Sequence, residues 1–512
     1  MVKMVKMAKM AEKTVKSRKL NRRVALGLSG GVDSAVSAYL LKEQGYDVYC
    51  VYLNCYDGDT PGCRGDNDRK DALAVAMHLG LPFQVLDFRK EYQAAVIDYF
   101  KKEYLLGRTP NPDVICNRDI KFGLFMDWSI KEGFDYIATG HYADGPGFSG
   151  RKIAGTPAPA EKRATSRERI VREVGEWQAK AGATFLRIPT DLHKDQTYFL
   201  WAVPGEKFKR VLFPLGNLLK TEVRKIALKI GLPVAQKKDS TGICFVGEVR
   251  VEDFLKQLGV KEKKGEVVIR SVIGSPSSVF SQKSAGYQFA GSGQINREPI
   301  NQNPTTENRK QITDNYQVVG SHRGAWFYTI GQRHGFEITQ WPPVSLSLRG
   351  ASRPARNAYS IAVAGGRVTW QSSEAVQDKP ILYVIEKDIK KNRLIVGFGA
   401  ECYRSEFEVG ECNWLSINVL THQRINASTH CFVRIRHGGE LIECTLTAKR
   451  QSLNAKIIQS RLSISDYRFT VALKAPQRGV APGQSAVFYL PRRSSAKAGD
   501  KNGIVLGGGV IQ

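Results

Sequence analysis

A pair of glycines between hydroxyl-bearing residues is the part of this sequence with the clearest chemical use. It lies in the run Ser29-Gly30-Gly31-Val32-Asp33-Ser34, directly after the apolar residues 24–28. Glycines allow close backbone approach and positive φ, so successive N–H groups can surround an anion at the positive end of a helix. The serines add hydroxyl donors, and Asp33 can hold a magnesium ion that bridges phosphates. The run therefore predicts a cradle for the pyrophosphate of ATP with Mg²⁺, and a tight turn without a ligand is the alternative.

The loop is not a P-loop of the Walker type, because no lysine follows the glycines at the required position. It resembles instead the loop of the PP-loop ATP pyrophosphatases, which cleave ATP between the α and β phosphates and transfer AMP to a substrate oxygen. That resemblance implies adenylation and leaves the substrate open.

Two of the nine cysteines stand in unusual surroundings. Cys116 follows two prolines that disfavour regular structure and precedes a helical pattern at 119–131. We expect it near a helix N-terminus, where the dipole and nearby Arg118 and Lys121 favour a thiolate; a buried structural cysteine is the alternative. Cys244 follows a polar turn that contains glycine, so it too is expected to be accessible. We interpret the other seven cysteines as structural.

Together these groups predict one chemistry. Adenylation turns a carbonyl oxygen into a leaving group, which a sulfur nucleophile can then replace. A persulfide on one cysteine would deliver its terminal sulfur, and the other cysteine would resolve the linkage as a disulfide bond.

Several segments in order resemble the tRNA-specific 2-thiouridylase family, whose members convert the wobble uridine of certain tRNAs to 2-thiouridine. These segments are GLSGGVDSAVSAYLL (27–41), GRTPNPDVICNRDIKF (107–122), ATGHYA (138–143), KDQTYFL (194–200), PLGNLLKTEVRKIA (214–227), KKDSTGICFVG (237–247), WFYTIGQRHG (326–335) and PGQSAVFYL (482–490).

The resemblance implies roles for individual residues. ATP would be bound by Gly27, Leu28, Ser29, Gly30, Gly31, Val32, Asp33, Ser34, Leu53 and Gly140. Cys116 would be the nucleophile, Cys244 would carry the persulfide, and Asp113 would be a general acid or base. Contacts with the target base or with tRNA would come from Asn111, Pro112, Asp113, His141, Lys194, Asp195, Gln196, Arg436, His437 and Gln484. For His141, structural packing beside the ATP site is the alternative. No metal site made by the protein itself is expected.

The sequence departs from the family pattern at a few positions. Leu53 stands where methionine is common, and Arg436-His437 stands where an arginine–aromatic pair is usual. Three segments without an obvious counterpart, at about 145–181, 271–317 and 343–378, are expected to be surface insertions or disordered loops.

Composition is consistent with a nucleic-acid partner. The 512 residues carry a formal net charge of +27, part of it in a lysine-rich arm at 1–23. Such an excess favours a polyanion, and a generally basic surface is the alternative. No run of about 18 apolar residues occurs, so we expect no membrane span. The scattered cysteines favour a reducing compartment, and we expect a cytoplasmic enzyme.

The elements that must position these residues predict an α/β fold. Strand-like runs at 24–28, 48–53, 83–87 and 136–139 alternate with helical ones, which is typical of a doubly wound parallel sheet. We expect a PP-loop domain at 24–205, a small central linker domain at 206–270 and a C-terminal antiparallel β-barrel at 318–512. The barrel is expected to include the segments ILYVIEKD, RLIVGFG, CFVRIRH and SAVFYL.

The leading hypothesis is ATP-dependent 2-thiolation of the wobble uridine in tRNA, with a persulfide donor protein (a cysteine desulfurase or a relay protein) as partner. One alternative is a PP-loop AMP-forming ligase of the argininosuccinate or amidotransferase type, which needs neither thiol. Another is an RNA-binding protein on a decayed ATPase scaffold.

Overall fold

The computed structural model describes residues 22–56, 65–145, 186–239, 242–247, 249–270, 316–340, 362–364, 367–369, 381–415, 428–449, 468–490 and 503–512. Two compact units share the chain: Met1–Lys261 with Tyr403–Gln512, and Glu262–Cys402. The expected arm at 1–23 and the three expected insertions lie mostly outside the described residues.

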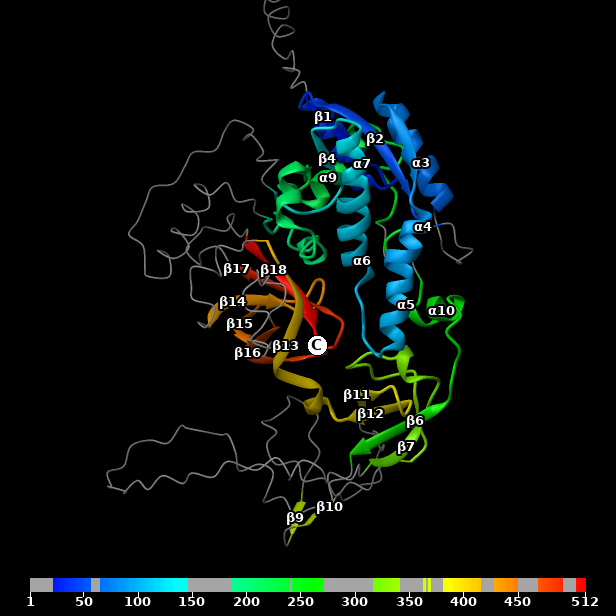
Figure 1. The fold of residues 1–512 in the computed structure, drawn as a ribbon, viewed down its shortest axis with the longest axis vertical. Coiled ribbons are helices and arrows are strands. Elements are labelled where there is room, and N and C mark those ends of the chain that lie inside the picture. Colours follow the sequence, from blue (N-terminus) through cyan, green and yellow to red (C-terminus); the bar gives the residue numbers. More distant parts are fainter. Residues whose placement is uncertain are drawn as a thin grey trace, which may run out of the picture. The chain divides into compact units, whose positions relative to one another are not determined.

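The first unit begins with a five-stranded parallel sheet of order β3-β2-β1-β4-β5 (Figure 1). Its strands are β1 (Arg23–Gly27), β2 (Asp47–Asn54), β3 (Phe83–Asp87), β4 (Tyr136–Ala138) and β5 (Val211–Leu212). The four strands predicted from the apolar runs are confirmed. The sheet also takes β5 from beyond the expected domain limit at residue 205, because that strand pairs with β4.

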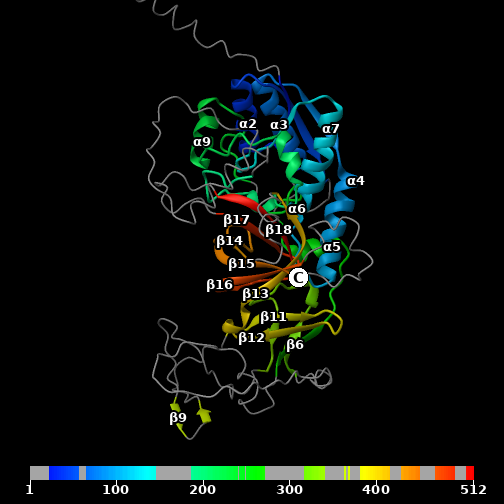
Figure 2. The same cartoon turned by 60° about the vertical axis from the view of Figure 1, so that its left-hand side comes forward.

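Helices cover both faces of this sheet, which confirms the doubly wound fold. The helices described in the first unit are α2 (Val32–Glu43), α3 (Gly65–Leu79), α4 (Arg89–Tyr92), α5 (Asp98–Leu105), α6 (Pro112–Ile115), α7 (Phe125–Lys131), α9 (Lys220–Lys229) and α10 (Val251–Gln257). Helices α2, α3 and α9 share one apolar core with the side chains of Val24, Leu26 and Val48, and α7 lies on the opposite side of the strands (Figure 2). Helix α2 ends before Gly45, whose φ of +84° closes the helix in the left-handed region.

The strand order places a ligand site. The chain passes from β1 outward to β2 and β3, and then returns to the other side of β1 with β4. At such a switch point the loops after the two neighbouring strands separate, and a crevice opens at their carboxyl ends. Here the loop after β1 is the glycine-rich run, and the loop after β4 contains Gly140.

The segment around Cys116 becomes helical at Pro112, before the start at residue 119 that the sequence predicts. Helix α6 starts at Pro112, where a proline is tolerated because the first helical N–H needs no acceptor. A π-helical segment, Cys116–Leu124, continues it and runs into α7. The expectation that both prolines disfavour regular structure is therefore wrong for Pro112.

A closed antiparallel barrel completes the first unit, with strand order β13-β16-β15-β14-β17-β18. Its strands are β13 (Tyr403–Trp414), β14 (Thr429–Arg434), β15 (Ile442–Lys449), β16 (Arg468–Arg478), β17 (Ser485–Leu490) and β18 (Ile504–Ile511). Alternating side chains such as Val409, Val433 and Phe488 fill its core. The expected C-terminal barrel is confirmed.

The second unit contains a separate five-stranded sheet of order β11-β12-β6-β7-β8. Its strands are β6 (Gly265–Arg270), β7 (Tyr316–His322), β8 (Glu337–Ile338), β11 (Tyr383–Asp388) and β12 (Arg393–Gly397); β9 (Ala362–Ala364) and β10 (Arg367–Thr369) form a two-stranded pair. The placement of ILYVIEKD and RLIVGFG in the barrel is wrong, because β11 and β12 pair with each other and β12 pairs with β6. Alternation of apolar and polar residues identifies a strand, but it does not identify the sheet to which the strand belongs.

Short 3₁₀ segments occur at Thr197–Phe199, Gly205–Arg210, Ala325–Phe327 and Gly399–Cys402. Across the described ranges, no helix is both long enough and apolar enough to cross a membrane.

Candidate active site

The loop between β1 and α2 is held by its own hydroxyl groups. The Ser29 N–H donates to Ser34 Oγ at 3.1 Å, the two serine hydroxyls lie 3.1 Å apart, and Ser34 Oγ donates to the Gly31 carbonyl at 3.2 Å. Gly31 is the N-cap of α2, and the first N–H groups of a helix have no acceptor within it. These donors at the positive helix end are suited to an anion.

Gly30 of the loop and Gly140 allow close backbone contact. Gly30 has a φ of +73°, and a Cβ there would lie 2.2 Å from the carbonyl oxygen of Asp68. A Cβ on Gly140 would lie 2.7 Å from the Ser34 nitrogen. Two predicted nucleotide-binding segments that are distant in sequence therefore meet at the N-terminus of α2. Leu53 on β2 and Val32 at the start of α2 are both buried, and less than a tenth of the surface of each is exposed.

Basic side chains that we did not single out from the sequence surround this loop. Lys220 Nζ lies 2.7 and 2.8 Å from the two carboxylate oxygens of Asp33 and 2.8 Å from Asp239. The Tyr142 hydroxyl donates to Asp33 at 3.0 Å. Burial alone would raise the pKa of Asp239, but hydrogen bonds from Lys194 and Lys220 lower it overall. Lys220 lies in the segment 214–227, which resembles the 2-thiouridylase family, and that resemblance was the sequence signal that could have identified it.

These residues fit a polyphosphate. The N–H groups at the N-terminus of α2, the Ser29 hydroxyl and the Lys220 ammonium can donate hydrogen bonds to an anion, the ammonium by exchanging its contacts with Asp33 and Asp239. They fit a protein-held metal less well, because Asp33 is already paired with Lys220. Among the residues that the structure describes, no cluster of three His, Cys, Asp or Glu side chains could hold a metal ion.

The two singled-out cysteines meet. A hydrogen bond joins the Cys116 and Cys244 thiols, both of which are present as free cysteines. Cys244 lies in a tight turn in which the Ile243 and Gly247 backbones exchange hydrogen bonds of 3.0 and 2.8 Å, and Phe245 adopts a φ of +65°. The Tyr92 hydroxyl donates to the Cys244 carbonyl at 2.5 Å and so ties this turn to the α4–α5 region.

The hydrogen bond between the two thiols and one lysine decide which thiol has the lower pKa. Burial raises the pKa of the Cys116 thiol well above its ordinary value, and the hydrogen bond with Cys244 raises it further. The hydrogen bond from Cys116, together with Lys121, lowers the pKa of the Cys244 thiol to about 7. The expectation of an accessible Cys116 thiolate is therefore wrong, since Cys116 is fully buried; Cys244 is partly exposed.

Lys121 lies one π-helical turn after Cys116, because π-helical hydrogen bonds join residues five apart. It hydrogen-bonds Cys244, and its Nζ lies 5.6 Å from the centre of the Phe245 ring. Burial alone would lower the pKa of Lys121, but Cys244 and Cys116 raise it overall, so the ammonium stays charged.

Asp113 lies beside the same turn. Asn111 caps α6 by accepting the N–H groups of Asp113 and Val114 at 3.2 and 3.4 Å. Asp113 Oδ1 in turn accepts the Cys244 N–H at 3.0 Å. Burial raises the pKa of Asp113, which brings this carboxyl group closer to the range useful for proton transfer near neutral pH.

The predicted tRNA-contacting residues at 194–196 are engaged within the protein. Lys194 pairs with Asp239 at 2.5 Å, and Gln196 Oε1 accepts the Tyr142 N–H at 2.8 Å. Asp195 is 2% exposed and accepts hydrogen bonds from Thr197 and, at 2.5 Å, from Arg434 of the barrel. Asp195 therefore joins the barrel to the parallel-sheet domain.

The remaining predicted contacts differ in exposure. Arg436 is exposed, and the exposed His437 packs its ring 4.4 Å from that of Phe199. Gln484 lies next to Gly483, where a Cβ would lie 2.7 Å from the Arg108 side chain, so the barrel loop adjoins the segment that leads to Asn111. His141 is buried, hydrogen-bonds Thr139 at 2.8 Å and has its pKa lowered well below the usual value by burial.

The fold and the site define a PP-loop protein with a HUP-type parallel-sheet domain. Residues 22–248 match the family described as tRNA methyl transferase HUP domain, residues 300–349 the tRNA methyl transferase PRC-barrel domain, and residues 454–511 the aminomethyltransferase beta-barrel domain. The second match begins inside the expected insertion at 271–317, so part of that segment has a family counterpart.

Relatives cover nearly the whole chain. It is 35% identical over 497 residues to the protein named tRNA-specific 2-thiouridylase MnmA of Pseudomonas fluorescens (strain SBW25), covering 96% of this chain and 95% of that one. It is 33% identical over 469 residues to the protein of the same name from Streptococcus thermophilus (strain ATCC BAA-491 / LMD-9), covering 91% and 92%. The chain belongs to the tRNA-specific 2-thiouridylase family, and it is a tRNA sulfurtransferase.

A solved complex of a 4-thiouridine synthetase with RNA and bound ATP is 15% identical, covers 46% of this chain and 51% of that one, and has a TM-score of 0.27. This likeness is too small to add to the assignment.

Proposed function

We propose that the protein catalyses ATP-dependent 2-thiolation of the wobble uridine in tRNA, through adenylation of the C2 oxygen and sulfur transfer from a persulfide on Cys244. The observation that carries the proposal is the hydrogen-bonded pair of Cys116 and Cys244, with Asp113 and Lys121 beside it. A PP-loop ligase would have no use for this arrangement, so the pair favours thiolation over the AMP-forming alternative.

In the first stage the uridine C2 oxygen attacks the α-phosphorus of ATP, an O–P bond forms and pyrophosphate leaves. Gly27, Leu28, Ser29, Gly30, Gly31, Val32, Asp33, Ser34, Leu53 and Gly140 would line the nucleotide site. Mg²⁺ would accompany ATP chiefly on phosphate oxygens and water, as is usual for nucleotide sites, and Asp33 could join it only by giving up Lys220.

Sulfur enters through Cys244. Its thiolate, favoured by Lys121, attacks the terminal sulfur of a persulfide on a donor protein, and the donor thiolate leaves. The terminal sulfur of the Cys244 persulfide then attacks C2, and AMP departs with the former uridine oxygen. This leaves C2 joined to Cys244 through two sulfur atoms.

Cys116 resolves that linkage. Its raised pKa means that it needs a base, and Asp113, whose pKa is raised as well, would accept the proton. Cys116 attacks the sulfur of Cys244, a Cys116–Cys244 disulfide forms, and 2-thiouridine is released. Two electrons and two protons from an external dithiol regenerate the thiols.

The RNA would meet both domains of the first unit. Asn111 and Pro112 directly precede Asp113, which lies next to the thiol pair, and Gln484 lies on the neighbouring barrel loop. Lys194, Gln196, Arg436 and His437 supply further polar groups for the tRNA. We assign His141 and Asp195, which are buried, a supporting part in that surface. The chemistry requires reduced thiols, which favours a cytoplasmic location.

Thiolation is tested by nucleoside mass spectrometry of tRNA incubated with the protein, ATP and a persulfide donor. We expect 2-thiouridine from the wild type and none from C116S or C244S, since each thiol has its own step. C55A is the matched control, because Cys55 lies near the thiol pair but takes no part in the proposed mechanism. Full activity of C116S or C244S with normal folding would contradict the mechanism and favour the ligase.

A further inference from the structure

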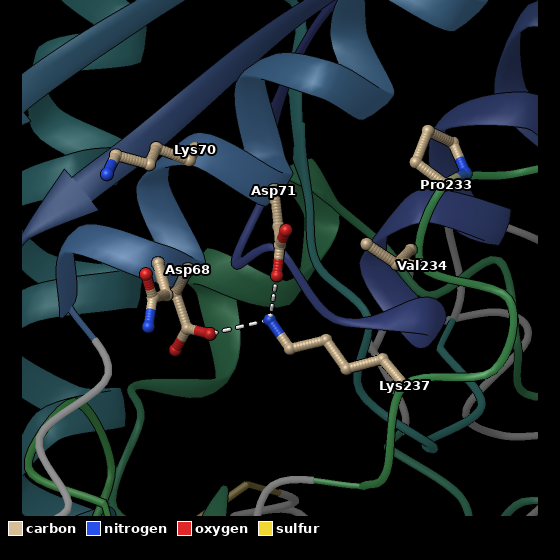
Figure 3. A pocket seen from close by; sticks show the side chains of 7 residues that line it. Asp68, Lys70, Asp71, Pro233, Val234 and Lys237 are labelled. Atoms are coloured by element: carbon tan, nitrogen blue, oxygen red, sulfur yellow. Dashed lines mark hydrogen bonds and ion pairs between the residues drawn. The ribbon is translucent and has the colours of Figure 1, made fainter.

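A second lysine beside the nucleotide loop, Lys237, is surrounded by three acceptors. Its Nζ lies 3.0 Å from the carbonyl oxygen of Gly30, 2.6 Å from Asp68 Oδ1 and 2.5 Å from Asp71 Oδ2. An ammonium has three donors, so these three contacts satisfy it. Figure 3 shows the side chain reaching across from the 233–237 segment to the two aspartates on α3.

The contact with Gly30 fixes the direction of a peptide group. In a trans peptide the carbonyl and the following N–H point to opposite sides. Because Lys237 holds the Gly30 carbonyl, the Gly31 N–H must point away from Lys237. Gly31 is the N-cap of α2, where the N–H groups available to an anion begin.

Gly30 is also confined from the other side. Its positive φ and its contact with the Asp68 backbone leave no room for a side chain. Lys237 bonds the side chain of the same Asp68. The loop is therefore clamped between the backbone of α3 and a lysine that α3 itself holds by two carboxylates.

We propose that Lys237 is a positioning residue for nucleotide binding: it orients the Gly30–Gly31 peptide so that the loop N–H groups face the phosphates, without touching the phosphates itself. The inference rests on the proposed use of ATP. Neutralisation of Asp68 and Asp71 is the second part of this role, because two unpaired carboxylates beside the loop would repel a polyphosphate.

The surroundings can accept a changed side chain. A cavity of about 540 Å³ lies beside Lys237 and is lined by Asn67, Asp68, Lys70, Asp71, Pro233, Val234 and Lys237. An arginine at 237 has room to reach the same acceptors, whereas methionine keeps the length but loses the donors and the charge. Lys238 is adjacent and exposed, so K238M is a control with the same change in charge.

The test measures binding of α,β-methylene-ATP, which is not cleaved between its α and β phosphates, and of AMP by calorimetry without tRNA. We expect K237M to bind the ATP analogue about tenfold more weakly, as for loss of a hydrogen bond to a charged group. AMP, which lacks the outer phosphates, should change less than about twofold. K237R should restore most of the affinity, and K238M should bind like the wild type.

The triple variant K237M/D68N/D71N separates positioning from charge neutralisation and also serves if K237M does not fold. If Lys237 acts by holding Gly30, this variant should still bind the analogue about tenfold more weakly than the wild type, although it has no unpaired carboxylates beside the loop. Recovery of wild-type binding by the triple variant would show that Lys237 only neutralises the two aspartates and would overturn the inference, as would unchanged binding by folded K237M. A wild-type chain that binds no ATP would overturn the proposed function as well.

Discussion

Lys121 offers the sharpest test of the electrostatics at the thiol pair. We expect K121M to raise the pKa of Cys244, because it removes the ammonium that hydrogen-bonds this thiol while leaving both cysteines in place. In the wild type that pKa is about 7, so half of Cys244 is thiolate at pH 7. The hydrogen bond from Cys116 remains in the variant, so only part of the shift should be lost.

A rise of about one pKa unit, or about 1.4 kcal/mol, is a reasonable magnitude for one buried counter-ion. The thiolate fraction at pH 7 would fall from about one half to about one tenth. The more basic thiolate is about threefold more nucleophilic, so the observed rate at pH 7 should fall only about twofold. The midpoint of the pH profile is therefore the informative quantity.

The assay is alkylation by iodoacetamide from acid to alkaline pH, with Cys244 followed by mass spectrometry of its peptide under reducing conditions. K131M removes an exposed lysine at the end of the same helical run and is the control for a general loss of charge. A K121M midpoint equal to that of the wild type, or a wild-type Cys244 that titrates at the ordinary value of about 8.5, would refute this account of the site.

Two further predictions concern how the domains and the loop are held. R434M should lower the free energy of unfolding by about 3–5 kcal/mol in urea titrations, because it leaves the buried Asp195 carboxylate without its ion pair. D195N/R434M should recover much of that loss, and equal losses in both variants would argue against a buried unpaired charge as the cause. G30A should lose ATP binding and about 1–3 kcal/mol of stability, because it combines a positive φ with a clash against Asp68. G80A is the control, since Gly80 also has a positive φ but nothing within 4 Å of an added Cβ; an equal loss of ATP binding there would contradict the argument.

Local patterns were sufficient for the elements that carry the chemistry. The apolar run before Ser29 and the helical spacing after Ser34 predicted β1 and α2 around a glycine turn, and the structure has them. This works because a glycine pair, an N-terminal turn and a buried strand each depend on neighbours in sequence. Helix α6 was missed, because its N-cap Asn111 and its first-turn proline were interpreted as a loop.

Contacts between distant segments could not be predicted in this way. Nothing near Cys116 in sequence indicates that it is fully buried, so the thiolate was assigned to the wrong cysteine of the pair. The sequence around Asp195 does not indicate that this residue pairs with Arg434, and the sequence around Lys237 does not indicate that its side chain reaches Gly30. The strands β11 and β12 were recognised as strands and placed in the wrong sheet.

The sequence alone determined the glycine-rich nucleotide loop, the order of strands and helices around it and the identity of the two thiols, because these follow from residue type and short-range spacing. Only the tertiary structure decided that the thiols touch, which of them is acidic and which lysines hold the loop. Those properties depend on burial and on charges within a few ångströms, and both are set by residues far away in the chain.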